Sequence, residues 1–223
     1  MRAVIFLFLL LAACGRPLTP AEKNFAKQIH GDTIAADRVR LVQGLPVDAV
    51  TFRRQKRPRL TCRERILPEP EDEIITTTPA AVALWNHILL SKPYYLKDYF
   101  DNYPEEMGLL SAMFFAHEIT HVWQWQNRTR TQYTPWRAGR EHGGGKDPYL
   151  FEISTDTRFL DYSYEQQASI VEEYVCCATL DPKAPRTERL KRLIQQEMPL
   201  QGIYIPKTVY LPWDGVEIKG ICR

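Results

Sequence analysis

The chain has 223 residues, of which 44% are hydrophobic and 25% are charged, and its formal net charge is +2. This length fits one compact domain with a sizeable core and argues against a second full domain. A net charge so close to zero also argues against nucleic acid as the main partner.

The first residues have the pattern of an export signal. Residues 1–13 begin with a basic residue, continue as an apolar run from Ala3 to Ala13, and end in small side chains before Cys14. This run is shorter than the roughly 20 residues that a helix needs to cross a bilayer. We therefore expect it to direct export and then to be cleaved.

The residues from Leu11 to Cys14 resemble a bacterial lipobox, whose cysteine is acylated and becomes the new first residue. The alternative is an ordinary cleavage site with a cysteine placed there by chance. A lipobox predicts a lipidated tether over residues 14–18, anchored by acyl chains in which each buried methylene contributes about 0.8 kcal/mol. Gly15 follows the cysteine, and the lack of an aspartate at this position resembles lipoproteins that are sent on to the outer membrane. We thus expect an exported lipoprotein, membrane-anchored in the periplasm.

The next part of the chain predicts one helix followed by strands. A capping box at Thr19 and Glu22, with proline at the first helical position, predicts a helix that ends near Gly31. Apolar stretches over 39–50, broken by glycine and proline, predict strands joined by turns. Further predicted elements are a strand over 73–78, which is rich in β-branched residues, and a helix over 80–90.

A basic run lies between these strands. Alternating charges on the exposed face of edge strands discourage aggregation, and this is the interpretation that we favour. The alternative is a surface that binds the cell wall or anionic lipid headgroups, which would require one exposed patch far from the histidines described below. The run comprises Arg53, Arg54, Lys56, Arg57, Arg59, Arg63 and Arg65.

The second half of the chain predicts mainly helices. Residues 105–127 have acidic residues in their first turn and apolar residues at helical spacing, which is typical of a long helix. Residues 127–145 are polar, aromatic and glycine-rich and predict a surface loop. A capping box at Ser163 and Gln166 opens a helix that should end near Leu180. Further predicted elements are a helix over 187–198 and a strand within 203–213.

The long predicted helix contains the HExxH motif, with His117, Glu118 and His121 as its defining residues. Residues four positions apart share a helix face, so both imidazoles can face one metal ion while Glu118 lies beside a water molecule. Zinc lowers the pKa of such a water toward about 7, and the glutamate acts as general base. The alternative is a pair of core histidines that bind no metal. On a buried apolar helix, such histidines would need several separate hydrogen-bond partners.

A catalytic zinc site needs a third protein ligand and an open position. A metzincin arrangement is excluded, because Gln124 and Asn127 stand where that family has glycine and histidine. Two later glutamates compete instead. Glu141 has a thermolysin-like spacing, but it precedes His142 and three glycines, a poor setting for a rigid ligand. Glu165 lies in the first turn of a predicted helix, in an ExxA sequence similar to that of gluzincins, and is the ligand that we predict.

Three segments give the chain a more specific resemblance. They are LTPAEKNFAKQIHGDTIAADRVR (18–40), AHEITHVWQ (116–124) and EQQASIVEEY (165–174), and together they cover less than a quarter of the chain. The chain resembles small proteobacterial zincin-like proteins that are labelled Vgr-related. This resemblance implies a compact gluzincin-like fold and a zinc site, but no defined substrate.

One position departs from the gluzincin pattern. Gluzincins often place an aspartate four residues after the ligand glutamate, where it orients a zinc-binding histidine, and this chain has Ser169 there. Glu172, on the same helical face as Glu165, is a candidate for that role, and an ordinary solvated glutamate is the alternative. The donor that stabilises a developing oxyanion is left open among Tyr149, Tyr162, Tyr164, His142 and Arg140.

Four cysteines remain after processing, in a compartment that would be oxidising, and predict two disulfides. Neighbours on a helix point about 100° apart, so the adjacent pair can each bond a different partner. The pairing is open, buried free thiols are the alternative, and a cysteine zinc site is disfavoured because CxxC spacing is absent. The candidates are Cys62, Cys176, Cys177 and Cys222.

These observations combine into one expectation. Residues 19–223 should form a single α+β zincin-like domain of minimal gluzincin type, with a small sheet beside the helix that carries the HExxH motif and with further helices. It should act as a zinc-dependent hydrolase, foremost a metallopeptidase for peptide bonds in the cell envelope. The rival interpretation is a non-catalytic envelope lipoprotein with a structural zinc ion or a protein-docking role. The expected partners are a peptide or protein substrate and the membrane.

Overall fold

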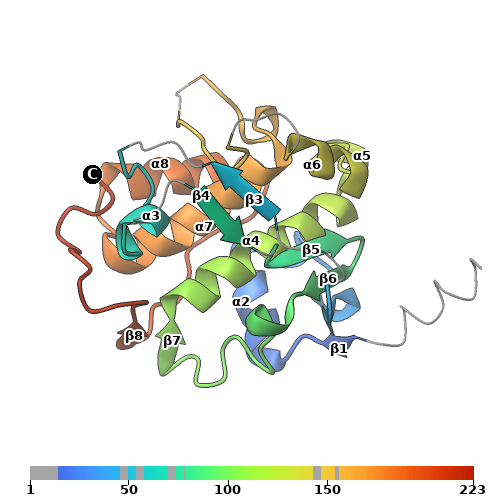
Figure 1. The fold of residues 1–223 in the computed structure, drawn as a ribbon, viewed down its shortest axis with the longest axis horizontal. Coiled ribbons are helices and arrows are strands. Elements are labelled where there is room, and N and C mark those ends of the chain that lie inside the picture. Colours follow the sequence, from blue (N-terminus) through green and yellow to red (C-terminus); the bar gives the residue numbers. More distant parts are fainter. Residues whose placement is uncertain are drawn as a thin grey trace, which may run out of the picture.

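The protein is a mixed α+β structure in which a small sheet lies on one side of a group of helices (Figure 1). The structure is a computed structural model that describes residues 15–45, 50–53, 58–69, 74–77, 79–142, 147–153 and 156–223, and the side chains of 50–53 and 74–77 are left out of the description. The predicted signal peptide and Cys14 lie outside these residues. None of the helices in the described part of the chain is long and apolar enough to cross a membrane.

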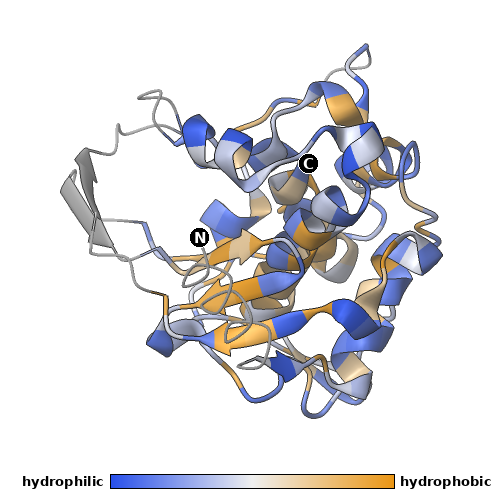
Figure 2. Ribbon diagram, turned by 90° about the vertical axis from the view of Figure 1, so that its right-hand side faces the viewer, coloured by the Kyte–Doolittle hydropathy of each residue, from blue (hydrophilic) through white to orange (hydrophobic). Residues whose placement is uncertain are grey.

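A four-stranded sheet has the strand order β1-β2-β6-β5. Strand β2 runs parallel to β6 and antiparallel to β1, and β5 and β6 form an antiparallel hairpin. Figure 2 shows that hydrophobic residues are concentrated along these strands. The strands are β1 (Arg16–Pro17), β2 (Arg40–Gln43), β5 (Ala81–Leu84) and β6 (His87–Leu90).

Two smaller strand pairs lie outside this sheet. Strands β3 (Val50–Arg53) and β4 (Ile74–Thr77) pair antiparallel, and β4 lies within the strand expected over 73–78. Strands β7 (Glu106–Gly108) and β8 (Thr208–Tyr210) pair in parallel. The second pair joins segments about a hundred positions apart in sequence, immediately before the helix that carries the HExxH motif.

The predicted helix boundaries are largely confirmed where a capping box was recognised. Helix α2 (Pro20–His30) begins after Thr19, whose side chain accepts a hydrogen bond from the backbone N–H of Glu22. Helix α7 (Tyr164–Leu180) begins after Ser163 in the same way. The remaining long helices are α4 (Leu109–Gln126) and α8 (Pro185–Ile194).

Helices α4 and α7 form the centre of the domain. Both are buried over most of their length, and they pack against each other within one hydrophobic core. On α4, Met113, Ile119 and Val122 are fully buried, and Met113 and Val122 lie on opposite sides of the helix axis. A helix that is apolar on all sides belongs in the middle of a fold. Polar groups on these two helices therefore lie in a largely dry interior.

Two expectations about local structure are wrong. Residues 80–90 form the β5–β6 hairpin instead of a helix. Ile88 and Leu90 are 1% exposed, while His87 and Leu89 are less buried, and this period of two is typical of a strand. Trp85 has φ of 58° in the turn that joins the strands. The loop expected over 127–145 contains two short helices, α5 (Arg128–Thr131) and α6 (Pro135–Glu141).

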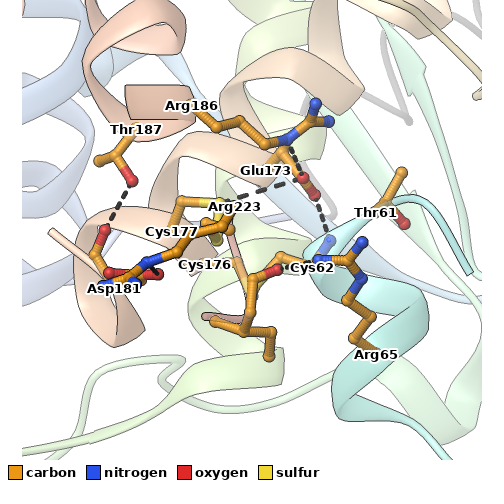
Figure 3. The surroundings of a disulfide bond; sticks show 12 residues. Thr61, Cys62, Arg65, Glu173, Cys176, Cys177, Asp181, Arg186, Thr187 and Arg223 are labelled. Atoms are coloured by element: carbon orange, nitrogen blue, oxygen red, sulfur yellow. Dashed lines mark hydrogen bonds and ion pairs between the residues drawn. A yellow bond between two sulfur atoms is a disulfide. The ribbon is translucent and has the colours of Figure 1, made fainter. Parts of the chain in front are cut away.

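Two disulfide bonds join helix α7 to distant segments. Cys62, at the start of helix α3 (Cys62–Ile66), is bonded to Cys176, and Cys177 is bonded to Cys222. All four cysteines are buried, and Figure 3 shows the cysteines of α7 beside Cys62. The prediction of two disulfides is confirmed, and the alternative of free thiols is wrong.

Candidate metal centre

Helix α4 places the two motif histidines on one face, one turn apart. The Nε2 atoms of His117 and His121 are 3.2 Å apart, and the two side chains are nearly fully buried. Glu118 is also buried, at 8% exposure, beside the same histidines. The helix that the HExxH pattern predicts thus brings two imidazoles and a carboxylate to one point of the interior.

Helix α7 brings Glu165 to the same point. One carboxylate oxygen, Oε2, lies 3.2 Å from Nε2 of His117 and 3.4 Å from Nε2 of His121. Within the described residues, these three side chains form a buried group whose donor atoms all lie within 4.8 Å of one another, a group that could bind a metal ion.

The competing glutamate, Glu141, has a different position and a different partner. Its two carboxylate oxygens accept hydrogen bonds from the backbone N–H groups of Tyr164 and Glu165, each at 2.9 Å. A carboxylate at a helix N-terminus satisfies free N–H groups and interacts favourably with the helix dipole. Glu141 therefore caps α7 and fixes the turn that presents Glu165.

The hydrogen bonds around the two rings indicate which nitrogens carry protons. Nδ1 of His117 lies 3.1 Å from Oε2 of Glu172, and Nδ1 of His121 lies 2.9 Å from Oε1 of Gln124. Both oxygens accept only, so each Nδ1 donates, and in the neutral rings each Nε2 is left with a lone pair.

Two such lone pairs and one carboxylate oxygen then face one another at 3.2–3.4 Å. Without a cation these acceptors would repel. Bonds of about 2.0–2.1 Å to a tetrahedral zinc ion separate the ligand atoms by about 3.3 Å. The donor set therefore fits a divalent metal ion in both chemistry and spacing.

The charges around the site follow the same logic. Burial by itself would lower the pKa of His117, but its hydrogen bonds to Glu165 and Glu172 outweigh burial and raise the pKa to about 10. Burial acts against ionisation of Glu165, yet the neighbouring histidines hold the pKa of its carboxyl well below the usual value. In the metal-free protein, protons supply the positive charge that this cluster of carboxylates requires.

Glu118 differs from the other carboxylates of the site. Burial raises its pKa, and this effect exceeds the opposing influence of His117 and His121. A carboxylate with a raised pKa is better suited to accept and return a proton near neutral pH. The motif glutamate thus has the electrostatic setting of a general base.

Behind His117, Glu172 is itself held by a cation. The Arg63 guanidinium lies 3.1 Å from Oε1 of Glu172 and keeps its pKa below the usual value although the carboxylate is buried. Carboxylates that receive the second N–H of a metal-binding imidazole fix its orientation. Glu172 has this position, and the alternative of a solvated glutamate is excluded by its 4% exposure.

Two of the five candidate oxyanion donors lie at the site. The Tyr149 ring centroid is 5.8 Å from that of His117 and 5.7 Å from that of His142, and Nε2 of His142 lies 3.1 Å from Oε1 of Glu165. The other three lie elsewhere: Tyr162 donates to the carbonyl of Glu152, Tyr164 donates to the carbonyl of Gln132, and Arg140 is exposed on α6.

Sequence reasoning did not find three residues around the site. Gln124 receives the Nδ1–H of His121 from one turn along α4, a spacing that could have suggested it. Tyr133 is buried with its ring 6.1 Å from that of His121, and Arg63 was assigned to a basic run. The last two come from other parts of the chain, so a single sequence carries no local signal for them. The rest of that basic run is in part outside the described residues.

Comparisons with known proteins add information on the fold. No protein-family model matches the chain, and no curated protein matches it. A solved structure, the effector domain of Pseudomonas aeruginosa VgrG2b, matches 81% of this chain and 82% of its own at 24% identity and a TM-score of 0.50. This likeness agrees with the sequence resemblance to Vgr-related proteins. At this identity it shows that the two domains are similar in fold.

Proposed function

We propose that the protein is a zinc-dependent hydrolase, foremost a metallopeptidase, with the zincin-like architecture of a minimal gluzincin. The observation that carries this proposal is the convergence of two imidazole lone pairs and one carboxylate oxygen at 3.2–3.4 Å in a buried site. Two histidines and one glutamate are the ligand set of several zinc peptidases, and they leave a position for water. Zinc suits this donor set of imidazoles and carboxylate better than magnesium or calcium does.

His117, His121 and Glu165 would hold the ion. When bound, zinc supplies Lewis-acid chemistry that polarises a carbonyl group and lowers the pKa of a water molecule. Glu118 takes the proton from the attacking water and passes it to the leaving amine, a role that its raised pKa favours. Water-mediated attack on a polarised carbonyl supports a peptide bond as the substrate.

Tyr149 is the residue that we assign to the developing negative charge. It is 41% exposed, so that it faces both the solvent side and the ring of His117. Partial desolvation of the phenol, together with the negative charges of Glu165 and Glu118, raises its pKa, which keeps the hydroxyl protonated and able to donate. His142, whose Nε2–H donates to Oε1 of Glu165, helps to hold that ligand.

The place of action follows from the sequence. We propose an exported lipoprotein anchored through Cys14, so that peptide bonds of the cell envelope are the accessible substrates. Mass spectrometry of the membrane fraction should find an acylated Cys14 peptide, and a Cys14→Ser variant should lose it. A soluble wild-type protein with an unmodified Cys14 would contradict the anchor without affecting the metal site.

Glu118→Gln provides the test of the reaction. We expect wild-type protein to bind one zinc ion per chain and to cleave members of a mixed peptide library. The variant should retain zinc and lose cleavage by at least about 100-fold, the usual contribution of a general base. Equal cleavage by both proteins would remove Glu118 from the mechanism.

A zinc ion that is bound without any peptide cleavage would favour the non-catalytic envelope lipoprotein. X-ray absorption at the zinc edge then distinguishes the two cases. Four protein ligands indicate a structural ion, and three protein ligands with one water oxygen indicate a catalytic geometry.

A further inference from the structure

Successive turns of α7 connect the metal site to the disulfides. Glu165 faces the histidines at the start of the helix, and Glu172 supports His117 two turns later. Glu173 and Cys176 follow, and both contact helix α3. One helix therefore carries a metal ligand, the carboxylate behind another ligand, and a covalent bond to a distant segment.

Helix α3 is attached to α7 at three points. Cys62 is bonded to Cys176, and its backbone N–H donates to Oε2 of Glu173 at 2.7 Å (Figure 3). Arg63, the next residue, forms the ion pair with Glu172 at 3.1 Å. Glu173 is 2% exposed and is also paired with Arg186 at 2.9 Å, so its position is fixed independently of α3.

The short length of α3 makes these attachments important. It has five residues, and a helix of that length is not stable in isolation. Its place on α7 must then come from tertiary contacts, of which the disulfide is the covalent one. Arg63 is adjacent to the bonded cysteine, and its position on Glu172 depends on where α3 is held.

We propose that the Cys62–Cys176 disulfide sets the metal affinity of the site, because it holds α3 so that Arg63 keeps Glu172 oriented toward His117. Arg63 is then a positioning residue that acts through two intervening groups. A dithiol reductant that transferred two electrons and two protons to this disulfide would leave two thiols, become a disulfide itself, and weaken metal binding. This inference rests on the proposed zinc site.

Two effects of Arg63 oppose each other. A nearby cation repels a bound dication, whereas the ion pair fixes the carboxylate that receives the His117 N–H. The guanidinium touches Glu172 directly, but Glu172 and the imidazole ring separate it from the metal position. Coulomb repulsion falls with distance and is screened at a half-exposed side chain. Orientation therefore dominates, and loss of Arg63 should weaken binding.

The second disulfide provides a matched control. Cys177–Cys222 also starts on α7, is equally buried and lies beside the first disulfide, with its sulfur atoms within 4.8 Å of that of Cys62, but it bonds α7 to the C-terminal segment and not to α3. We would replace each pair by alanine, because four reduced thiols would themselves bind zinc. Loop entropy varies only logarithmically with length, so the two variants should lose comparable stability.

The experiment measures zinc affinity by competition with a chromophoric chelator. It also measures the free energy of unfolding of each metal-free protein. Cys62→Ala/Cys176→Ala and Arg63→Gln should each weaken zinc binding about tenfold, the lower end of the range for residues behind metal ligands. Their combination should add little, and Arg63→Lys should recover part of the loss. Cys177→Ala/Cys222→Ala should change the affinity less than either of these variants despite its lower stability, because it leaves the bond between α3 and α7 and the Arg63–Glu172 ion pair in place.

The possible outcomes separate this inference from the proposed function. Equal zinc affinity in all variants, or equal losses in both disulfide variants, would overturn the proposed role of the Cys62–Cys176 disulfide and leave the zinc site intact. Arg63→Gln keeps both disulfides, so it tests the inference even if a cysteine variant does not fold. A wild-type protein that binds no zinc would overturn the proposed function itself.

Discussion

Two buried histidines, one on helix α4 and one packed against that helix from α2, have opposite electrostatic properties. His117 faces Glu165 and Glu172, and their hydrogen bonds raise its pKa to about 10 in the metal-free protein. His30, at the end of α2, is stacked on Trp123 with ring centroids 6.1 Å apart, and burial lowers its pKa to about 3. Its Nδ1 has no hydrogen-bond partner among the described residues.

The difference shows that burial alone does not identify a functional histidine. His30 is a neutral packing residue because its surroundings offer no charge, only the weak contact of 3.5 Å with Thr120. His117 is surrounded by negative charge in a dry interior, an arrangement that is costly unless a cation binds. The number of carboxylates that converge on a ring is therefore the more informative property.

The largest expected effect comes from Glu165, one of the carboxylates that distinguish the surroundings of His117 from those of His30. Glu165→Gln should weaken zinc binding by more than about 100-fold, because residues behind metal ligands already contribute 10–100-fold. Glu141→Gln, which alters only the cap of α7, should change zinc affinity much less. Bound zinc per chain, measured by atomic emission after gel filtration, checks both. Equal zinc retention in the two variants would point to a different ligand set.

Tyr149→Phe should give the next largest effect. Loss of one donor to a developing oxyanion typically lowers kcat by about 100-fold. Zinc affinity should not change, because the phenol contacts the site without being one of its ligands. Peptide cleavage rates and zinc titration of the same preparation measure the two quantities. A variant with unchanged kcat would remove Tyr149 from the reaction.

The smallest effect concerns the pH dependence of stability in the chelator-treated protein. The folded-state pKa of His30 is about 3 and its unfolded pKa is about 6.5. The unfolded state thus binds more protons at acidic pH. The contribution of neutral His30 to the free energy of unfolding is therefore fully present above pH 6.5 and is lost as the pH falls toward 3. By pH 4.5 the loss should be of order 2–3 kcal/mol relative to His30→Gln.

His117 should show the opposite dependence. Its folded-state pKa is raised, so the contribution to stability is fully present below pH 6.5 and is lost as the pH rises toward 10. The difference in unfolding free energy between wild type and His117→Gln, followed by urea denaturation across pH, should therefore shrink at alkaline pH. If both differences changed in the same direction, the contrast between the two histidines would be wrong.

The sequence predicted the parts of the fold that local chemistry determines. Helices α2 and α7 were placed by their capping boxes, and the face of α4 by the spacing of His117 and His121. Glu172 was found because it lies on the same face of α7 as Glu165. In each case the signal lies within a few residues, where helix geometry is fixed.

What could not be predicted depends on contacts between distant segments. The pairing of Cys62 with Cys176, and the contact of Arg63 with Glu172, bring together residues more than a hundred positions apart. The β5–β6 hairpin was missed although Ile88 and Leu90 alternate with less buried residues, because a short apolar run does not separate helix from strand.

The parallel pairing of β7 with β8 has a consequence for biogenesis. The strand that leads directly into α4 gains its partner only when residues 208–210 have been synthesised, and Cys177 gains its partner later still. Contacts of such long range form late in folding. A chain truncated before β8 should therefore be more sensitive to proteolysis at the start of α4 than the full-length protein is.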